Sequence, residues 1–347
     1  MTIPVVEPRS LSGSFLALQD PEVARALEVG LEQVEAALRD AVRHADGYID
    51  AASSHLVAAG GKRLRPMLTL LAGQLGPDAG TRGPVAASDD VVKAAVVVEL
   101  THLASLYHDD VMDEALMRRG VPSGNARYGN TVAILTGDLL FARASLVVAD
   151  LGTEAVRIQA ATFERLCTGQ VHETVGPSPQ DDPVEHYLSV LADKTASLIA
   201  TAGLFGARFG GSDPATVEVL RCFGERVGVA FQLADDLLDL SADLTESGKT
   251  PGTDLREGIP TLPVLLARRS TDPADARLLE LLDADLTDDA LHAEALELLR
   301  AHPALEQARM QTHRWADDAR AALAPLPESS VKDALTALAQ GVVDRSM

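Results

Sequence analysis

The sequence predicts an all-α protein, and three observations carry the prediction. Ala, Leu, Glu and Arg dominate the chain from Asp20 onward, apolar residues recur at three- and four-residue spacing, and no alternating strand pattern with hairpin turns is present. A chain of 347 residues that is 46% hydrophobic can also bury a large core. We therefore expect one helical domain over residues 20–347, preceded by an N-terminal tail over residues 1–19.

The ends of the first helices are marked by their residues. Asp20-Pro21 supplies a cap and a first-turn proline for a long helix into the Ala41 region, and Gly60-Gly61 ends the next one. Stretches rich in Gly, Pro, Ser and Asp then interrupt the helical pattern. We expect loops within one domain there, because no stretch is long enough to separate two cores. These loops span residues 76–90, 176–183, 247–258 and 270–274.

Residues 94–119 are apolar around most of a helical circumference, which predicts a helix buried on nearly all sides. Four of its polar residues are spaced by 3, 4 and 4 positions and therefore share one stripe of the helix. The stripe consists of His102, Ser105, Asp109 and Asp113. Asp110 completes a DDxxD string with the last two.

A second DDxxD string, Asp235, Asp236 and Asp239, follows Gln232 on a segment otherwise made of Val, Ala, Phe and Leu. Ionised carboxylates are costly in an apolar interior unless they are paired, hydrogen-bonded or bound to metal. One aspartate run could be a solvated helix face, but two matched copies in apolar helices favour cations held between them.

The donor set favours Mg²⁺ as the cation. Oxygen ligands at positions i and i+4 suit Mg²⁺, which prefers one or two carboxylates together with water and substrate phosphate. No Cys or His cluster competes for a softer metal, since Cys167 and Cys222 are the only cysteines. Two cysteines also fit a reducing compartment.

Basic residues supply the second half of the predicted site. Only five of the 30 basic residues are lysines, and three of these lie in Gly- or Thr-flanked strings around Lys62, Lys194 and Lys249. In GGKRLRP, the glycines permit close backbone approach, and the planar Arg65 suits bidentate phosphate contact. An exposed helix start is the alternative for this string, and a helix-terminal charge pair is the alternative for Arg118-Arg119.

The formal charge of −21 argues against nucleic acid or an anionic membrane as a partner. No export signal is evident at the N-terminus, and no stretch approaches about 18 uninterrupted apolar residues. We expect a cytoplasmic protein with no stable membrane insertion, although an apolar substrate could bring it transiently to a membrane.

The strings GGKRLRP, LYHDDVMDEALMRRG, DKTAS, FQLADDLLDL and GKTPGTDL, in this order over residues 60–263, resemble the trans-isoprenyl diphosphate (polyprenyl) synthases. The resemblance implies an all-α bundle around a deep central cavity, usually a homodimer, with the two aspartate helices facing each other. It also implies the reaction, in which isopentenyl diphosphate is condensed with an allylic diphosphate.

The resemblance assigns roles to the matching residues. Asp109, Asp113 and Asp235 would bind Mg²⁺, with Asp110, Asp236 and Asp239 completing the catalytic aspartates. Isopentenyl diphosphate would be held by Lys62, Arg65, His102 and Arg119, with Arg63 beside them. The allylic diphosphate would be held by Arg118, Lys194, Thr195, Gln232 and Lys249, with Lys194 also counted as catalytic.

Metals and cations would stabilise the charge that develops on the departing pyrophosphate. In the family the released pyrophosphate is the usual base, so no side-chain base is needed, and we expect His108 to make a structural hydrogen bond. One departure stands out. Many members read a lysine after the glycine of the DLxEG string, where this chain has Ile259-Pro260 after Gly258.

Small residues lie upstream of the first motif, where bulky aromatics shorten the product in the family. Helical projection places Ser105 about 40° from Asp109 and Ala104 about 140° away, so Ser105 is the expected wall of the chain path. Simple packing would also explain small residues there. We expect a product longer than farnesyl, a long polyprenyl such as a quinone side-chain precursor, with geranylgeranyl as the alternative.

Two rival functions share the fold. A terpene cyclase usually mixes Asn, Ser or Thr with Glu at its second metal site, which Asp235, Asp236 and Asp239 do not match. A non-catalytic subunit of a heteromeric synthase would be expected to lose metal aspartates, and all six are present.

Overall fold

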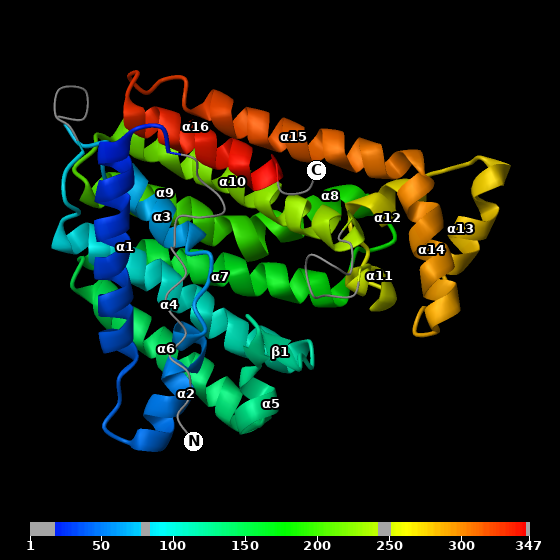
Figure 1. Cartoon of the computed structure of the whole chain (residues 1–347), viewed down its shortest axis with the longest axis horizontal. Helices are drawn as coiled ribbons and strands as arrows, with labels where there is room; N and C mark the ends of the chain where they lie inside the picture. The colour runs from blue at the N-terminus through cyan, green and yellow to red at the C-terminus, as the bar shows by residue number, and fades with distance from the viewer. Residues whose placement is uncertain (1–17, 78–83, 242–250, 345–347) are drawn as a thin grey trace. The chain divides into compact units, whose positions relative to one another are not determined.

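The computed structural model describes residues 18–77, 84–241 and 251–344 (Figure 1). Within these ranges the chain is helical apart from one short hairpin, which confirms the predicted all-α class. The contacts divide the chain into two units. The first unit comprises Met1–Glu164, Leu198–Gly224 and Leu323–Ala337, and the second comprises Arg165–Ser197, Glu225–Ala322 and Leu338–Met347. The single domain and its start at residue 20 stay predictions.

The helices of the first unit begin where their capping residues predict. Asp20 accepts hydrogen bonds from the backbone N–H groups of Glu22 and Val23 at 2.8 and 3.3 Å, and Pro21 occupies the first turn. Asp46 caps the next helix in the same way. The helices of this unit are α1 (Pro21–Val42), α2 (Gly47–Ala58), α3 (Leu64–Ala72), α4 (Asp89–Met112), α5 (Gly124–Tyr128) and α6 (Asn130–Ala149), with parts of α7 (Thr153–Val175), α9 (Ser197–Phe209), α10 (Pro214–Ser241) and α16 (Ser330–Val343).

Helix α4 is central to the first unit because it packs against α1, α3 and α6. Its buried residues lie on every side, as its apolar circumference predicts. The helix ends at Met112, seven residues earlier than predicted. Glu114 has a positive φ of 48°, and the chain turns into a hairpin of β1 (Met117–Arg118) and β2 (Val121–Pro122). Arg118 and Arg119 are therefore not helical.

The second unit is built around α12 (Leu262–Ala267). This helix is buried at all six residues and packs against α15 (Pro303–Ala322), α8 (Pro183–Leu191) and α14 (Asp289–Ala301). The core of the second unit is almost entirely Leu, Val and Ala. The remaining elements are the π-helix η1 (Ala192–Ala196), α11 (Thr253–Arg256), the 3₁₀ turn η2 (Pro273–Asp275) and α13 (Ala276–Leu282), with the rest of α7, α10 and α16.

Two helical stretches are long and apolar enough to span a membrane on length and composition alone: α6 and Pro183–Phe209. In Pro183–Phe209, 61% of the most apolar 18-residue stretch is buried inside the protein, as expected of a core helix. In α6 the corresponding share is 33%. Helix α6 therefore exposes apolar side chains that the first unit does not cover.

Candidate active site

The first aspartate string lies at the C-terminal end of α4, where its three carboxylates differ in environment. Asp110 is 0% exposed and accepts hydrogen bonds from Arg118 Nε at 2.6 Å and from the Gly124 backbone N–H at 3.1 Å. Its carboxylate therefore ties α4 to the hairpin and to α5. Asp109 is half-buried and Asp113 is exposed. These two carboxylates lie one helical turn apart and are the more accessible ones of the string.

The hairpin places Arg119 at its turn. Arg119 and Gly120 have φ values of 54° and 77°, the left-handed pair that a two-residue hairpin turn requires. The Arg119 guanidinium donates to the carbonyl oxygens of Leu56 and Gly60. It also lies against Gly61, where an added Cβ would stand 2.8 Å from Arg119 Cζ. The φ of 151° at Gly61 favours glycine there, and any other side chain would also have to displace the guanidinium of Arg119.

A cationic cluster surrounds Glu99 of α4, which is 2% exposed. Arg63 Nη1 lies 2.7 Å and Arg119 Nη2 lies 3.8 Å from Glu99 Oε1. Within the described residues, the buried Nε of Arg65 has no hydrogen-bond partner. Burial, together with Arg119, lowers the pKa of Arg65 to about 10, although Glu99 opposes the shift. An unsatisfied buried donor among cations is suited to an anionic ligand.

His102 belongs to the same cluster. Burial lowers its pKa well below 6.5, and the charges of Arg65 and Arg119 lower it further. The imidazole is therefore neutral at pH 7, with one N–H to donate and one nitrogen to accept. A neutral histidine can donate a hydrogen bond to a phosphate without adding to the repulsion among the arginines.

Arg63, a substrate contact predicted from the sequence, lies in an internal ion network in the structure. Its side chain is 1% exposed and is held by Glu99 and by Glu35, which accepts from Nε and, at 3.3 Å, from Nη2. Glu99 and Glu35 raise the pKa of Arg63 against the effect of burial, so the group stays charged. One signal in the sequence could have indicated this network: Glu99 is a lone carboxylate within an apolar run.

The second aspartate string, on α10, repeats the pattern of a buried middle residue. Asp236 is 8% exposed and accepts hydrogen bonds from the Tyr187 hydroxyl and, at 2.9 Å, from Gln232 Nε2. Burial raises its pKa to about 6, with Asp235 and Asp239 contributing and the two hydrogen bonds opposing. Asp235 is half-buried. Asp236 is thus an internal acceptor, and Asp235 is the more accessible carboxylate.

Asp239 holds the start of α11. Its Oδ1 accepts from the Thr253 backbone N–H at 3.2 Å, and its Oδ2 accepts from the Asp254 N–H at 3.0 Å. His292, in turn, bonds the Gly252 carbonyl at 2.8 Å, so a second residue also holds the start of α11. Asp239 therefore has a structural contact that the sequence did not predict.

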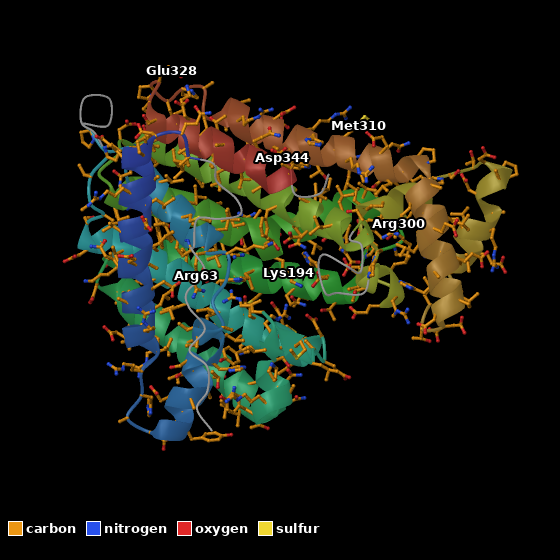
Figure 2. All side chains as sticks on the ribbon, viewed as in Figure 1. Arg63, Lys194, Arg300, Met310, Glu328 and Asp344 are labelled. Atoms are coloured by element: carbon orange, nitrogen blue, oxygen red, sulfur yellow. The ribbon has the colours of Figure 1, made fainter. Side chains whose placement is uncertain are left out.

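Lys194 and Thr195 lie on η1, a single π-helical turn of the kind that often marks functional sites. Gly169 permits the close approach of α7 to η1, since a Cβ there would stand 2.5 Å from the backbone nitrogen of Lys194. Lys194 Nζ pairs with Glu173 (Lys194 is labelled in Figure 2), and Thr195 Oγ1 donates to Gln232 Oε1 at 3.3 Å. The structure thus joins Thr195, Gln232 and Asp236 in one network.

The remaining predicted residues are placed as follows. Ala104 is fully buried, whereas Ser105 is half-buried and donates to the His102 carbonyl at 2.9 Å. His108 Nε2 bonds the Ile134 carbonyl at 3.1 Å, which confirms the expected structural hydrogen bond. Ile259 is exposed. Lys62 is exposed beside the cluster, and Lys249 lies outside the described residues.

No three His, Cys, Asp or Glu side chains form a preassembled metal cluster in the parts of the chain that the structure describes. The paired carboxylates Asp109 and Asp113 nevertheless fit Mg²⁺ chemically. Magnesium commonly takes only one or two carboxylates and completes its shell with water and substrate phosphate.

Comparison with known proteins identifies the class. The family model for polyprenyl synthetase matches residues 46–299. Nonaprenyl diphosphate synthase of Mycobacterium tuberculosis is 48% identical over 328 residues, 94% of this chain and 96% of that protein. Octaprenyl diphosphate synthase of Escherichia coli is 34% identical over 313 residues, 90% and 94% of the two chains.

A solved structure agrees in fold. Geranylgeranyl pyrophosphate synthase from Corynebacterium glutamicum, complexed with calcium and isoprenyl diphosphate, has a TM-score of 0.84 and 44% identity, covering 95% of this chain and 99% of that one. The all-α fold and the near-complete coverage of these matches define an isoprenoid synthase. The chain belongs to the polyprenyl synthetase family of trans-prenyltransferases, which confirms the resemblance seen in the sequence.

Proposed function

We propose that this chain condenses isopentenyl diphosphate with an allylic diphosphate in a Mg²⁺-dependent reaction that releases pyrophosphate. The observation that carries the proposal is the cationic cluster of Arg65, His102 and Arg119. His102 belongs to α4, the helix that carries Asp109 and is followed directly by Asp113. His102 and Asp109 are seven residues apart on α4, about 10 Å along the axis. A diphosphate held by the cluster is therefore within reach of a second substrate held near the carboxylates.

The metal ligands proposed are Asp109, Asp113 and Asp235. Bound Mg²⁺ supplies Lewis-acid stabilisation of the charge that develops on the leaving pyrophosphate. The C. glutamicum relative binds calcium together with isoprenyl diphosphate, which supports a divalent-metal requirement. Asp110, Asp236 and Asp239 support these ligands through the hydrogen bonds described above.

The substrate contacts follow the charge of each cluster. Arg65, Arg119, Lys62 and neutral His102 bind isopentenyl diphosphate, and Lys194, Thr195, Gln232 and Arg118 bind the allylic diphosphate. These donors fix both diphosphates before reaction, so that little reorganisation is needed when the allylic C–O bond breaks. The alkene of isopentenyl diphosphate then attacks the allylic carbon, and the released pyrophosphate takes the proton.

The product proposed is a long-chain polyprenyl diphosphate, a quinone side-chain precursor in the cytoplasm. The small Ser105 one turn below Asp109 supports it, as do relatives named for nonaprenyl and octaprenyl products. A geranylgeranyl product is the second candidate, because the C. glutamicum structure is named for that activity. Contact with membranes, where such a product partitions, would be transient.

The purified chain tests the proposal directly. It should be incubated alone with Mg²⁺, labelled isopentenyl diphosphate and allylic primers of increasing length, and the dephosphorylated products analysed by mass spectrometry. We expect extended products of about 40 carbons or more, by analogy with the nonaprenyl and octaprenyl relatives named above, and no turnover with EDTA. A sole C20 product would establish the geranylgeranyl alternative. No extension with any primer would favour the non-catalytic subunit, and a cyclised hydrocarbon would favour the terpene cyclase.

A further inference from the structure

We propose that the buried ion network Glu35–Arg63–Glu99 is a positioning device for the isopentenyl diphosphate site. This inference rests on the proposed function. In it, Arg63 and the two carboxylates touch no substrate, but they fix where Arg65 and Arg119 present their guanidinium groups. The network differs from the substrate contacts because its central cation is 1% exposed.

Arg63 (labelled in Figure 2) has an unusual, left-handed backbone conformation. Arg63 has a φ of 51° and stands at the N-terminal boundary of α3, and only Lys62 separates it from Gly60 and Gly61, whose φ values are 81° and 151°. A left-handed conformation costs a residue with a side chain roughly 1–3 kcal/mol and persists only when its surroundings impose it. No side chain caps α3. The bonds from Arg63 to Glu35, Glu99 and the Val57 carbonyl are what hold this conformation.

The backbone conformation of Arg63 determines the direction of the Arg65 side chain. Arg65 lies two residues after Arg63, in the first turn of α3, so its direction depends on the φ and ψ of Arg63. A change of backbone region at Arg63 would swing the start of the helix and carry Arg65 away from His102. The buried Nε of Arg65 has no hydrogen-bond partner within the described residues, so this atom adds no bond that would fix the guanidinium.

The hairpin residue Arg119 lies against the carboxylate of Glu99, which also holds Arg63. Glu99 Oε1 is shared between Arg63 at 2.7 Å and Arg119 at 3.8 Å. Arg119 also donates to the Gly60 carbonyl and lies against Gly61, so the two-glycine turn is clamped between the hairpin and Arg63. One carboxylate oxygen therefore sets the separation between the two sides of the cationic cluster.

Charge alone would predict the opposite role for Glu99. A carboxylate within 4 Å of a phosphate-binding arginine repels an incoming diphosphate, so removing its charge should tighten binding. If Glu99 positions the arginines, removing its charge should weaken binding, because Arg63, Arg65 and Arg119 repel one another once their shared counter-ion is lost. The sign of the change separates the two cases.

The experiment compares Glu99→Gln with the wild-type enzyme. We expect the KM for isopentenyl diphosphate to rise at least tenfold and the KM for the allylic primer to change less than threefold. Titration calorimetry with isopentenyl diphosphate alone should show the same loss of affinity without requiring turnover. Glu35→Gln should also raise the KM for isopentenyl diphosphate. Glu294→Gln, which removes the ion pair with Arg277 in the second unit, is the matched control and should leave both KM values unchanged.

Folding and function are kept apart by a double variant. Removing one partner of a buried pair is strongly destabilising, whereas replacing both partners by neutral residues is often tolerated. Arg63→Met/Glu99→Gln should therefore fold, as circular dichroism and thermal unfolding can verify. Its KM for isopentenyl diphosphate should be raised about as much as in Glu99→Gln, and not by the product of the single effects.

An unchanged or lower KM for isopentenyl diphosphate in folded Glu99→Gln or in the double variant would overturn the inference. That outcome leaves the proposed function intact, since the wild-type enzyme would still make product. Inactivity of the wild-type chain with every primer would instead remove the proposed function, while the calorimetric comparison would still test the network.

Discussion

At the scale of single residues, the two aspartate strings share one division of roles. The middle carboxylate of each is buried and satisfied within the protein, Asp110 by Arg118 and Gly124, Asp236 by Tyr187 and Gln232. The first carboxylate of each, Asp109 and Asp235, stays half-buried. Buried carboxylates with two donors are rigid, so they orient the helix end on which the accessible carboxylates are carried.

Replacing Asp109 by alanine should abolish most of the activity. A lost electrostatic contact to developing charge commonly costs 10²–10³ in turnover, so we expect a kcat decrease of about 10²-fold or more. The measurement is steady-state incorporation of labelled isopentenyl diphosphate, with circular dichroism to verify the helical fold. Asp40→Ala, at an exposed position of α1, is the control and should be near wild type. Near-normal turnover in Asp109→Ala would refute the metal assignment.

The pKa of Asp236 predicts a pH dependence of stability in the absence of metal and substrate. Its folded-state pKa is raised by burial to about 6 from the ordinary value of 3.8, so between these values the folded state binds more protons than the unfolded state. The charged carboxylate therefore destabilises the fold increasingly as pH rises through this window.

Asp236→Asn removes that titration. From pH 4 to pH 8, the free energy of unfolding of the variant minus that of the wild type should rise by about 2 kcal/mol, whatever its starting value. Urea unfolding at a series of pH values measures the difference. A difference that stays flat over this range would show that Asp236 is ionised at its ordinary pKa in the folded chain.

At the scale of elements, the positions of the helices could be predicted from the sequence more reliably than the residues at which the helices of the site end. Caps such as Asp20-Pro21 act locally, so the start of α1 could be predicted. The apolar run of α4 could be predicted too, but not its end at Met112. That end depends on the pairing of Met117 with Pro122, a contact that periodicity does not reveal.

The same limit applies to the site. Residue types and spacing indicated the aspartates, Arg65 and His102, and the family resemblance added Arg119; their metal and substrate roles stay predictions. Arg63 was assigned to substrate because it sits in the same string, whereas its partner Glu35 comes from another helix, 28 residues away. A buried ion pair between distant segments leaves no local pattern. The cap that Asp239 provides to α11 was missed for the same reason.

The stripe on α4 gives a prediction about product length. Ser105 lies one turn before Asp109, so an aromatic ring there would stand about 6 Å along the helix from the carboxylate. Ser105→Phe should shift products to shorter chains by one or more C5 units, read by mass spectrometry after dephosphorylation. Ser189→Phe, the same substitution at an exposed position of α8, should leave the distribution unchanged. If both distributions match wild type, the growing chain does not pass Ser105.

At the scale of the whole molecule, net charge and exposed apolar surface act in opposite directions. The formal charge of −21 favours separate, soluble copies. Helix α6, however, exposes Leu135 by 60% and Leu146 by 64%, on one face because eleven residues make close to three turns. Exposed apolar side chains at this spacing on a helix are suited to an isologous contact with a second copy. This face supports the homodimer proposed from the family.

The dimer should depend on this face and on salt. Each buried leucine contributes about 1.5–3 kcal/mol, so Leu135→Glu/Leu146→Glu, which also adds like charges across a two-fold axis, should give a monomer of unchanged helicity. Because two copies of charge −21 repel, raising NaCl from 20 to 300 mM should strengthen the wild-type dimer by screening. Light scattering after size exclusion and sedimentation at both salt concentrations measure these effects. A variant that remains dimeric, or a wild-type chain that dissociates as salt rises, would place the contact on a different surface.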